Sequence, residues 1–167
     1  MTDDTYHFHQ TPVALAQALI PLVPLEPHDT LYEPFKGEGS FYDHFPEGHP
    51  KDWSEITQGR DYKDYSGEYD WVISNPPFRL ETDKGRVNSI WFLIDYYSQR
   101  AKKGIAFLVN DYGLSTLTPI RLAVLKERGW ALEGITICNV KKWRGRYFFL
   151  VFRKGAKPCM TGLIGSY

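Results

Sequence analysis

This sequence of 167 residues has only two cysteines, and it has neither a net charge nor a long apolar run. Cys138 and Cys159 lack metal-ligand spacing and lack the density of a disulfide-stapled secreted domain. We therefore expect no metal site and a reducing compartment. No apolar run approaches the roughly 18 residues of a membrane span, and the first ten residues are polar and acidic. These absences predict a soluble, cytoplasmic protein with no membrane partner.

The charge is balanced, with 20 lysine and arginine residues against 20 aspartate and glutamate residues. A neutral chain lacks the global positive field that by itself drives strong non-specific binding to nucleic acid. Any contact with a polyanion must therefore come from a local patch or from a partner.

A hydrophobic content of 43% over this length is enough for one buried core, so we expect a single domain spanning residues 1–167. Aromatic residues make up 16%, which indicates a dense core or flat stacking surfaces, and composition does not distinguish the two. Neither an internal repeat nor a low-complexity linker is visible.

Strand-like apolar runs alternate with helical stripes along the chain. Strands are predicted at residues 30–33, 69–74, 105–109, 135–138 and 147–152, with a weak signal at 53–56. Helices are predicted from Thr11-Pro12, near Ser40, through the stripe at 90–97 closed by Gly104, and between Thr118-Pro119 and Gly129. Residues 79–89 are expected to form a polar loop. The alternation predicts an α/β fold with a mostly parallel sheet, helices on both faces and an antiparallel edge from the last hairpin.

The first predicted strand runs into a turn with two glycines, Gly37 and Gly39, which let the backbone approach a ligand closely. A phosphate ligand is disfavoured because Glu38 sits inside the turn, whereas a ligand with a positive centre and an amino group suits Glu33 and Glu38. An ordinary tight turn is an equally good interpretation. If the turn binds a ligand at the surface, Gly39→Val should abolish binding and leave the fold largely intact.

Two acidic residues follow at useful distances. Glu55 lies about 20 residues beyond the glycine turn, where a carboxylate can accept both ribose hydroxyls of a nucleoside. Asp61 can accept a hydrogen bond from an adenine amino group. Taken alone, Glu55 is more often a solvated surface acid and Asp61 more often part of a turn, so both gain a binding role only from the motifs around them.

The tetrapeptide Asn75-Pro76-Pro77-Phe78 at the end of a buried strand is the most specific signal. Two prolines freeze the backbone, so the Asn75 oxygen and the Pro76 carbonyl are held as acceptors for the two N–H groups of an exocyclic amine. These acceptors would free the lone pair of the amine for attack. Phe78 supplies a face on which a flat target can stack. The alternative is a rigid turn that begins at Asn75.

Taken together, these segments resemble the class I S-adenosylmethionine-dependent methyltransferases, specifically their N6-adenine type. Residues 33–41 resemble the glycine-rich cofactor motif of the family, and Glu55 stands where the family has its ribose-binding acidic residue. Residues 75–78 match the catalytic (Asp/Asn/Ser)-Pro-Pro-(Tyr/Phe/Trp) motif. The resemblance covers nearly the whole chain and implies a Rossmann-like sheet. It implies that S-adenosylmethionine is held by Gln10, Thr11, Pro12, Glu33, Pro34, Phe35, Gly37, Gly39, Phe41, Glu55, Asp61, Tyr62 and Asn75. The catalytic residues it implies are Asn75, Pro76, Pro77 and Phe78.

The late basic segment resembles the hairpin that these enzymes place beside the target base. We expect the nucleic-acid contacts to be Lys141, Lys142, Trp143, Arg144 and Arg146, although a solvated basic hairpin explains them equally well.

The substrate implied is N6 of adenine in DNA. One alternative keeps methyl transfer to an amino group but acts on RNA or on a glutamine side chain of a protein. The other alternative is a non-catalytic subunit of a methyltransferase complex, which transfers no methyl group. Members of the family that act on duplex DNA usually carry a target-recognition region, and no segment here is long enough for one. This departure favours a substrate that is recognised by a short sequence context or is single-stranded. Alternatively, a homodimer or a partner subunit would supply target recognition. Compact forms of this kind occur in phages and large viruses.

Overall fold

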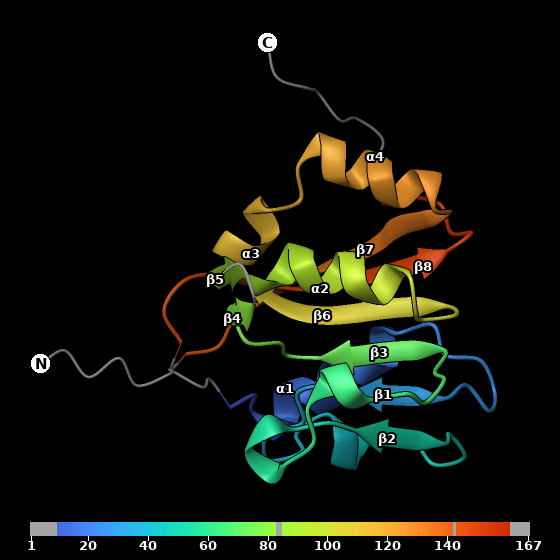
Figure 1. Cartoon of the computed structure of the whole chain (residues 1–167), viewed down its shortest axis with the longest axis vertical. Helices are drawn as coiled ribbons and strands as arrows, with labels where there is room; N and C mark the ends of the chain where they lie inside the picture. Colours follow the sequence, from blue (N-terminus) through green and yellow to red (C-terminus); the bar gives the residue numbers. More distant parts are fainter. Residues whose placement is uncertain (1–9, 83–84, 142, 161–167) are drawn as a thin grey trace, which may run out of the picture.

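A six-stranded sheet organises the protein, whose computed structural model describes residues 10–82, 85–141 and 143–160 (Figure 1). The strand order is β2-β1-β3-β6-β8-β7. The strands are β1 (Leu31–Glu33), β2 (Lys51–Trp53), β3 (Trp71–Ser74), β6 (Gly104–Asn110), β7 (Trp130–Cys138) and β8 (Tyr147–Lys154). Strands β2, β1, β3 and β6 are parallel, and β8 is antiparallel to both of its neighbours. The predicted α/β fold with a mostly parallel sheet and a C-terminal hairpin is confirmed, although the antiparallel strand lies inside the sheet and β7 forms its edge.

Helices cover both faces of this sheet (Figure 1). The helices are α1 (Val13–Leu19), α2 (Ser89–Ser98), α3 (Asp111–Ser115) and α4 (Pro119–Glu127). Short 3-10 turns are η1 (Ile20–Leu22), η2 (Tyr42–His44), η3 (Ile56–Gln58) and η4 (Tyr62–Asp64). Because side chains alternate along a strand, Val72 belongs to the core cluster that contains the buried face of α2, whereas Trp71 and Ile73 belong to the cluster that contains α1 on the opposite face.

The prediction of a helix near Ser40 is wrong, because only the three-residue turn η2 forms there. Pro46 forces the preceding residue out of helical geometry, and Phe45 accordingly has φ −59° and ψ 140°. Gly104 does not close a helix either. It opens β6, where a Cβ atom would lie 2.0 Å from the Trp71 ring.

The described residues between Arg79 and Asn88 pair as two strands rather than forming the expected polar loop. The strands are β4 (Arg79–Thr82) and β5 (Gly85–Asn88), with Leu80 opposite Val87. The Asn88 side chain then caps α2 by accepting from Ile90 N. The hairpin therefore connects the end of β3 directly to the start of α2.

Among the helices that the structure describes, none combines the length and the apolar character that crossing a membrane requires.

Candidate functional site

The site is built where parallel strands β1, β2 and β3 end side by side. Leu31 of β1 pairs with Lys51 of β2 and with Trp71 of β3, so the residues that follow these strands meet at one edge of the sheet. A cavity of about 510 Å³ opens there. It is lined by Pro34, Phe35, Glu55, Ile56, Thr57, Asp61, Tyr62, Lys63, Pro77, Arg79, Leu80 and Glu81. The structure therefore brings both predicted acids, Phe35 at the start of the glycine turn and Pro77 of the tetrapeptide to one cavity, whereas the two glycines and Asn75 do not line it.

The glycine turn has the backbone geometry that its sequence predicts. Gly37 has φ 54° and Gly39 has φ 91°, both in the region that favours glycine. Gly39 is buried, however, and a Cβ atom there would lie 2.4 Å from Asp43 Oδ2. A valine there would be strained by the positive φ and would displace the Asp43 carboxylate, a cost to the fold that the sequence did not predict.

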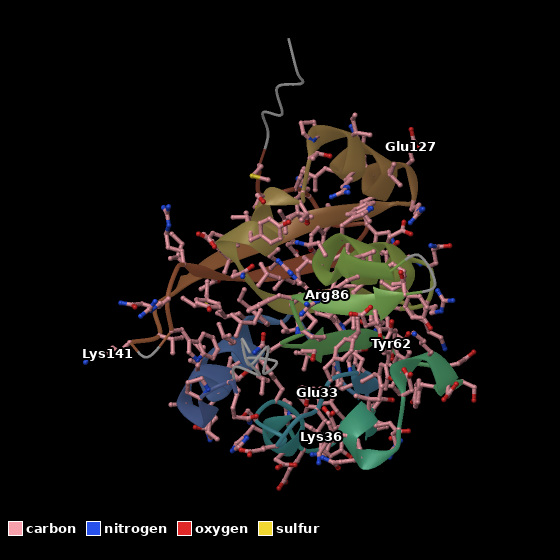
Figure 2. All side chains as sticks on the ribbon, turned by 60° about the vertical axis from the view of Figure 1, so that its left-hand side comes forward. Glu33, Lys36, Tyr62, Arg86, Glu127 and Lys141 are labelled. Carbon is pink, nitrogen blue, oxygen red and sulfur yellow. The ribbon has the colours of Figure 1, made fainter. Side chains whose placement is uncertain are left out.

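Glu33 is buried beneath this turn. It is 2% exposed, and its Oε2 accepts from Tyr42 N at 2.7 Å. Burial raises the pKa of Glu33 well above its ordinary value, and the Tyr42 hydrogen bond and the charge of Lys36 oppose the rise only in part. Figure 2 shows Glu33 and Lys36 in the lower half of the molecule, where β1 and its turn lie.

Glu55 holds the glycine turn in place. Its Oε2 accepts from Gly37 N at 2.8 Å, and its Oε1 accepts from Thr57 N at 3.1 Å and from Thr57 Oγ1 at 2.7 Å. The side chain is 3% exposed and also lines the cavity. The carboxylate predicted for a ribose therefore has a supporting role that its sequence position did not reveal.

The Asp61-Tyr62 segment forms a further wall. Asp61 Oδ1 caps η4 by accepting from Lys63 N at 3.0 Å, and the Tyr62 ring lies 5.1 Å from the Phe35 ring. Burial raises the pKa of Tyr62 to about 12. Within the described part of the chain, the buried Tyr62 hydroxyl has no hydrogen-bond partner. The wall is thus aromatic, with an acid beside it.

The N-terminal segment links the glycine turn to the tetrapeptide. Gln10 Nε2 donates to Ser40 Oγ at 2.7 Å, and Ser40 Oγ donates to the Thr11 carbonyl at 2.6 Å. Asn75 Nδ2 donates to Thr11 Oγ1 at 3.1 Å. Pro12 is exposed and starts α1 through its carbonyl, which accepts from Leu15 N. Gln10 and Thr11 therefore act between the two motifs, outside the cavity wall.

The tetrapeptide is held from the hairpin side. Ser89 Oγ donates to the Pro77 carbonyl, and Ser89 N donates to the Phe78 carbonyl at 3.2 Å. Pro76 is buried. The Phe78 ring lies 6.4 Å from the Tyr147 ring at the start of β8. These contacts hold the second half of the tetrapeptide, Pro77 and Phe78.

Phe41 does not reach the cavity. It is 1% exposed and packs against Phe149 at 6.3 Å in the core around α1. The family resemblance implied that Phe41 binds the cofactor, because it lies at the end of the glycine turn. In the structure its side chain packs in the core instead.

The basic segment lies at the same edge of the sheet as the tetrapeptide. Lys141, Arg144 and Arg146 are exposed, and Lys141 projects outward at the left of Figure 2. The Trp143 ring lies 4.6 Å from the Tyr147 ring. Lys142 lies outside the described residues.

Hairpin β4-β5 supplies cavity residues that sequence reasoning missed. Arg79, Leu80 and Glu81 line the cavity opposite the glycine turn. The alternation of polar and apolar residues from Arg79 to Thr82 was the available signal, but four residues are too few to separate a strand from a loop.

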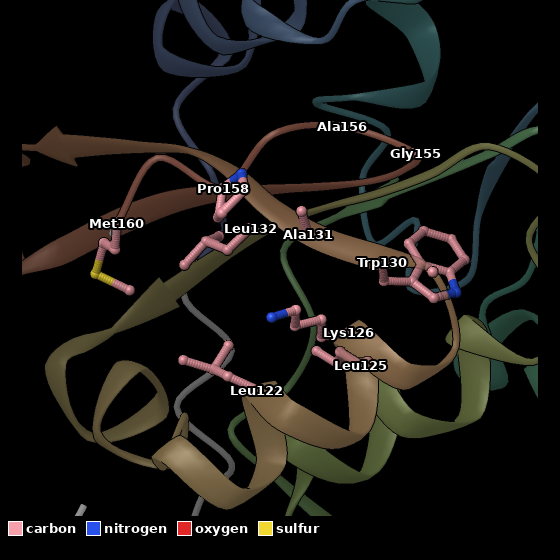
Figure 3. Close-up of a pocket in the computed structure, with 11 residues that line it drawn as sticks. Leu122, Leu125, Lys126, Trp130, Ala131, Leu132, Gly155, Ala156, Pro158 and Met160 are labelled. Carbon is pink, nitrogen blue, oxygen red and sulfur yellow. The ribbon is translucent and has the colours of Figure 1, made fainter. Parts of the chain in front are cut away.

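A second cavity, of about 670 Å³, lies between α4 and β7 (Figure 3). Its walls include Leu122, Leu125, Trp130 and Met160, and none of the predicted site residues lines it. The cavity at the end of β1 and β3 is the smaller one, but it is where the predicted ligand-binding and catalytic segments meet.

No protein-family model and no curated protein sequence matches the chain. Solved structures do match its fold. TrmN from Thermus thermophilus is 18% identical with a TM-score of 0.56, over 85% of this chain and 48% of that one. A modification subunit assigned to a type I restriction enzyme from Vibrio vulnificus YJ016 is 14% identical with a TM-score of 0.64, over 94% and 46%.

A third structure is magnesium protoporphyrin IX methyltransferase from Synechocystis PCC 6803 with bound S-adenosylmethionine. It is 11% identical with a TM-score of 0.56, over 84% of this chain and 76% of that one. The chain spans about half the length of the first two proteins. At these identities the comparisons show that the chain has the Rossmann-like methyltransferase fold.

Proposed function

We propose that the protein is an S-adenosylmethionine-dependent methyltransferase acting on an exocyclic amino group, with N6 of adenine in DNA as its target. One observation carries the proposal. Pro77 of the tetrapeptide lines the same cavity as Phe35, Glu55 and Tyr62, so a bound cofactor and an amine at Asn75 would be neighbours. The fold shared with a methyltransferase that contains bound S-adenosylmethionine supports the choice of cofactor.

The residues present fit this cofactor. The cavity volume lies within the range of about 300–1,000 Å³ that is typical of small-molecule sites. Phe35 and Tyr62 offer aromatic surface to an adenine, Asp61 offers an acceptor to its amino group, and Glu55 offers carboxylate oxygens to the ribose. Glu33 places a carboxyl group beneath the glycine turn, where the positively charged amino end would favour its ionised form. When bound, S-adenosylmethionine supplies an electrophilic methyl group on a positively charged sulfur.

Asn75 has the position needed to activate the target. Its amide nitrogen donates to Thr11, which orients the amide so that its oxygen is the end offered to an amine N–H. The Pro76 carbonyl is the second acceptor, and a proline has no N–H that would compete. With its lone pair freed by these acceptors, the amine nitrogen would be the nucleophile for the methyl group that the cofactor supplies, and the amine proton would pass to solvent. The two prolines restrict this backbone, and Ser89 holds the carbonyls of Pro77 and Phe78 that follow it, so the acceptors would need little movement.

Two features support a nucleic-acid substrate. Phe78 and the exposed basic segment lie at one edge of the sheet, so a base on Phe78 would have its phosphates near Arg144 and Arg146. The fold is also shared with a modification subunit of a restriction enzyme, a kind of protein that acts within an assembly. Target recognition would come from a second copy or from a partner subunit, because the described segments around the site contain no larger insertion than hairpin β4-β5.

The test is transfer of a labelled methyl group from S-adenosylmethionine to four substrates in parallel: single-stranded DNA, duplex DNA, RNA and a glutamine-containing protein. We expect labelling of adenine-containing DNA, identified as N6-methyladenine after digestion. Labelling of RNA or protein alone would keep the chemistry and overturn the substrate. Tight cofactor binding without transfer to any substrate would support the non-catalytic subunit instead.

A further inference from the structure

The second cavity, at the opposite edge of the sheet from β2, has no role in the site described so far. Its volume of about 670 Å³ exceeds that of the cavity at the ends of β1 and β3, and it lies within the range of about 300–1,000 Å³ that is typical of small-molecule sites. Figure 3 shows it between α4, the start of β7 and the segment that follows β8. Its apolar side chains come from all three of these segments and include Leu122, Leu125, Trp130, Leu132, Pro158 and Met160.

Hydrogen bonds hold these walls in place. Gly155 N donates to the Gly129 carbonyl at 2.9 Å. Cys159 N donates to the Leu132 carbonyl, also at 2.9 Å, so the segment after β8 is tied to the start of β7 at two points. The Trp130 indole on the wall donates from Nε1 to a carbonyl of α2 at 3.0 Å. The cavity is therefore a preformed part of the fold, as binding sites for small molecules usually are.

The charge around this cavity is positive. Among the described residues that line it, only Lys126 has a charged side chain, and Figure 3 shows that side chain reaching from α4 into the space between α4 and β7. Lys154 Nζ lies 5.3 Å from the centre of the Trp130 ring, and Lys157 belongs to the segment after β8. None of these three lysines forms an ion pair with another described residue. Glu127, next to Lys126 in α4, does not line the cavity, so an anion there would meet cations without a competing acid on the walls.

We propose that this cavity binds a small molecule with an apolar chain and a carboxylate end. The walls would bury the chain, because apolar surface that is removed from water stabilises a complex. Lys126 would pair with the carboxylate at the opening, where both groups keep contact with water and little desolvation is needed. A compact polyanion is a poor match, because the described walls offer it only one charged side chain. None of the predicted site residues lines this cavity, so the site is independent of the proposed methyl transfer.

The experiment is calorimetric titration of the full chain with octanoate and with octanol, which has the same chain length and no charge. Octanoate should bind with a Kd below about 1 mM and about fivefold more tightly than octanol. Lys126→Gln should weaken octanoate binding about threefold and leave octanol binding unchanged, because only the anion uses the lysine. Leu122→Ser, at a half-buried wall residue, should weaken the binding of both ligands. Lys51→Gln removes an exposed lysine of β2, at the other edge of the sheet, and is the matched control that should bind both ligands as the parent does.

Absence of octanoate binding by the parent would overturn the proposal, as would equal affinities for octanoate and octanol. An unchanged octanoate affinity of Leu122→Ser would place the ligand elsewhere, and an equal loss in Lys126→Gln and Lys51→Gln would remove the role of Lys126; either result overturns the proposal. Binding that appears only after Leu163 and Ile164 are replaced by Ser would also overturn it, because residues 161–167 would then be the occupant. A failure of methyl transfer refutes the proposed function alone, because none of these binding measurements depends on it.

Discussion

The side-chain amide of Asn75 donates to the hydroxyl of Thr11 at 3.1 Å, across 64 positions of the chain. Thr11 is 5% exposed and precedes α1, so the orientation of the proposed catalytic amide depends on the N-terminal segment. The role that resemblance gave to this segment was cofactor binding. The structure adds a positioning role.

Thr11→Val should lower the rate of methyl transfer by about fivefold, because it keeps the side-chain shape and removes the acceptor that orients Asn75. A hydrogen bond of this kind contributes about 1 kcal/mol, and about 1.4 kcal/mol corresponds to a factor of ten in rate. Single-turnover transfer measures the effect, and Thr11→Ser, which keeps the hydroxyl, is the control. Equal rates for the Val and Ser variants would show that the contact does not position Asn75.

Gly39→Val should destabilise the fold. A residue other than glycine at positive φ costs about 1–2 kcal/mol, and the added side chain would also displace the Asp43 carboxylate. Gly48 is the matched control, because its φ is 82° and no described atom lies within 4 Å of the Cβ position. Urea denaturation should therefore show a larger loss for Gly39→Val than for Gly48→Val, and Asp43→Ala should recover part of the difference. Equal losses would show that Asp43 moves away freely.

The strands could be predicted from sequence because their residues carry a local pattern. Residues 105–109 are uniformly apolar and lie in β6, which is buried on both faces. The site could be predicted only as separate motifs. The hydrogen bond from Gly37 to Glu55 and the bond from Asn75 to Thr11 join distant residues, and no local pattern encodes them.

Side-chain direction was equally invisible in the sequence. Phe41 follows the glycine turn directly, yet its side chain lies in the core, where it packs with Phe149. Leu80 was assigned to a polar loop, yet it lines the cavity because pairing with Val87 fixes its face of the hairpin.

The buried carboxyl group of Glu33 should make stability fall as pH rises. Burial raises the pKa of Glu33 in the folded chain well above the ordinary value of 4.5. Between these two values the folded chain holds a proton that the unfolded chain has lost, so the free energy of unfolding decreases with increasing pH. Each unit by which the pKa of Glu33 is raised in the folded chain corresponds to about 1.4 kcal/mol in the free energy of unfolding.

Glu33→Gln cannot ionise, and its stability should lack this decrease. Urea denaturation of both proteins between about pH 5 and pH 8 gives the difference between them, which cancels the contribution of other groups to first order. A difference that does not change with pH would show that Glu33 ionises in the folded protein as it does in the unfolded chain.

The exposed arginines beside Trp143 should account for most of the salt dependence of nucleic-acid binding. Each phosphate contact contributes about 0.7 to the logarithmic salt slope on a single strand and about 0.9 on a duplex. Replacing Arg144 and Arg146 by Ala should therefore lower the slope by up to about twice that amount. Lys157→Ala is the control, because Lys157 follows β8 at the opposite edge of the sheet. An unaltered slope in the double variant would place the phosphate contacts elsewhere.

Asn75→Ala separates the proposed catalytic motif from the cofactor cavity. Asn75 does not line the cavity, so the affinity for S-adenosylmethionine, measured by calorimetry, should stay nearly the same. Transfer should fall at least 10²-fold, or by roughly 3 kcal/mol of barrier, because one preorganised acceptor for the target amine is lost. Asn75→Asp should transfer faster than Asn75→Ala, since a carboxylate still accepts from the amine. Single-turnover methylation of an adenine-containing oligonucleotide at saturating cofactor is the measurement. Transfer by Asn75→Ala at the parental rate would refute amine activation by Asn75 even if the cofactor binds as proposed.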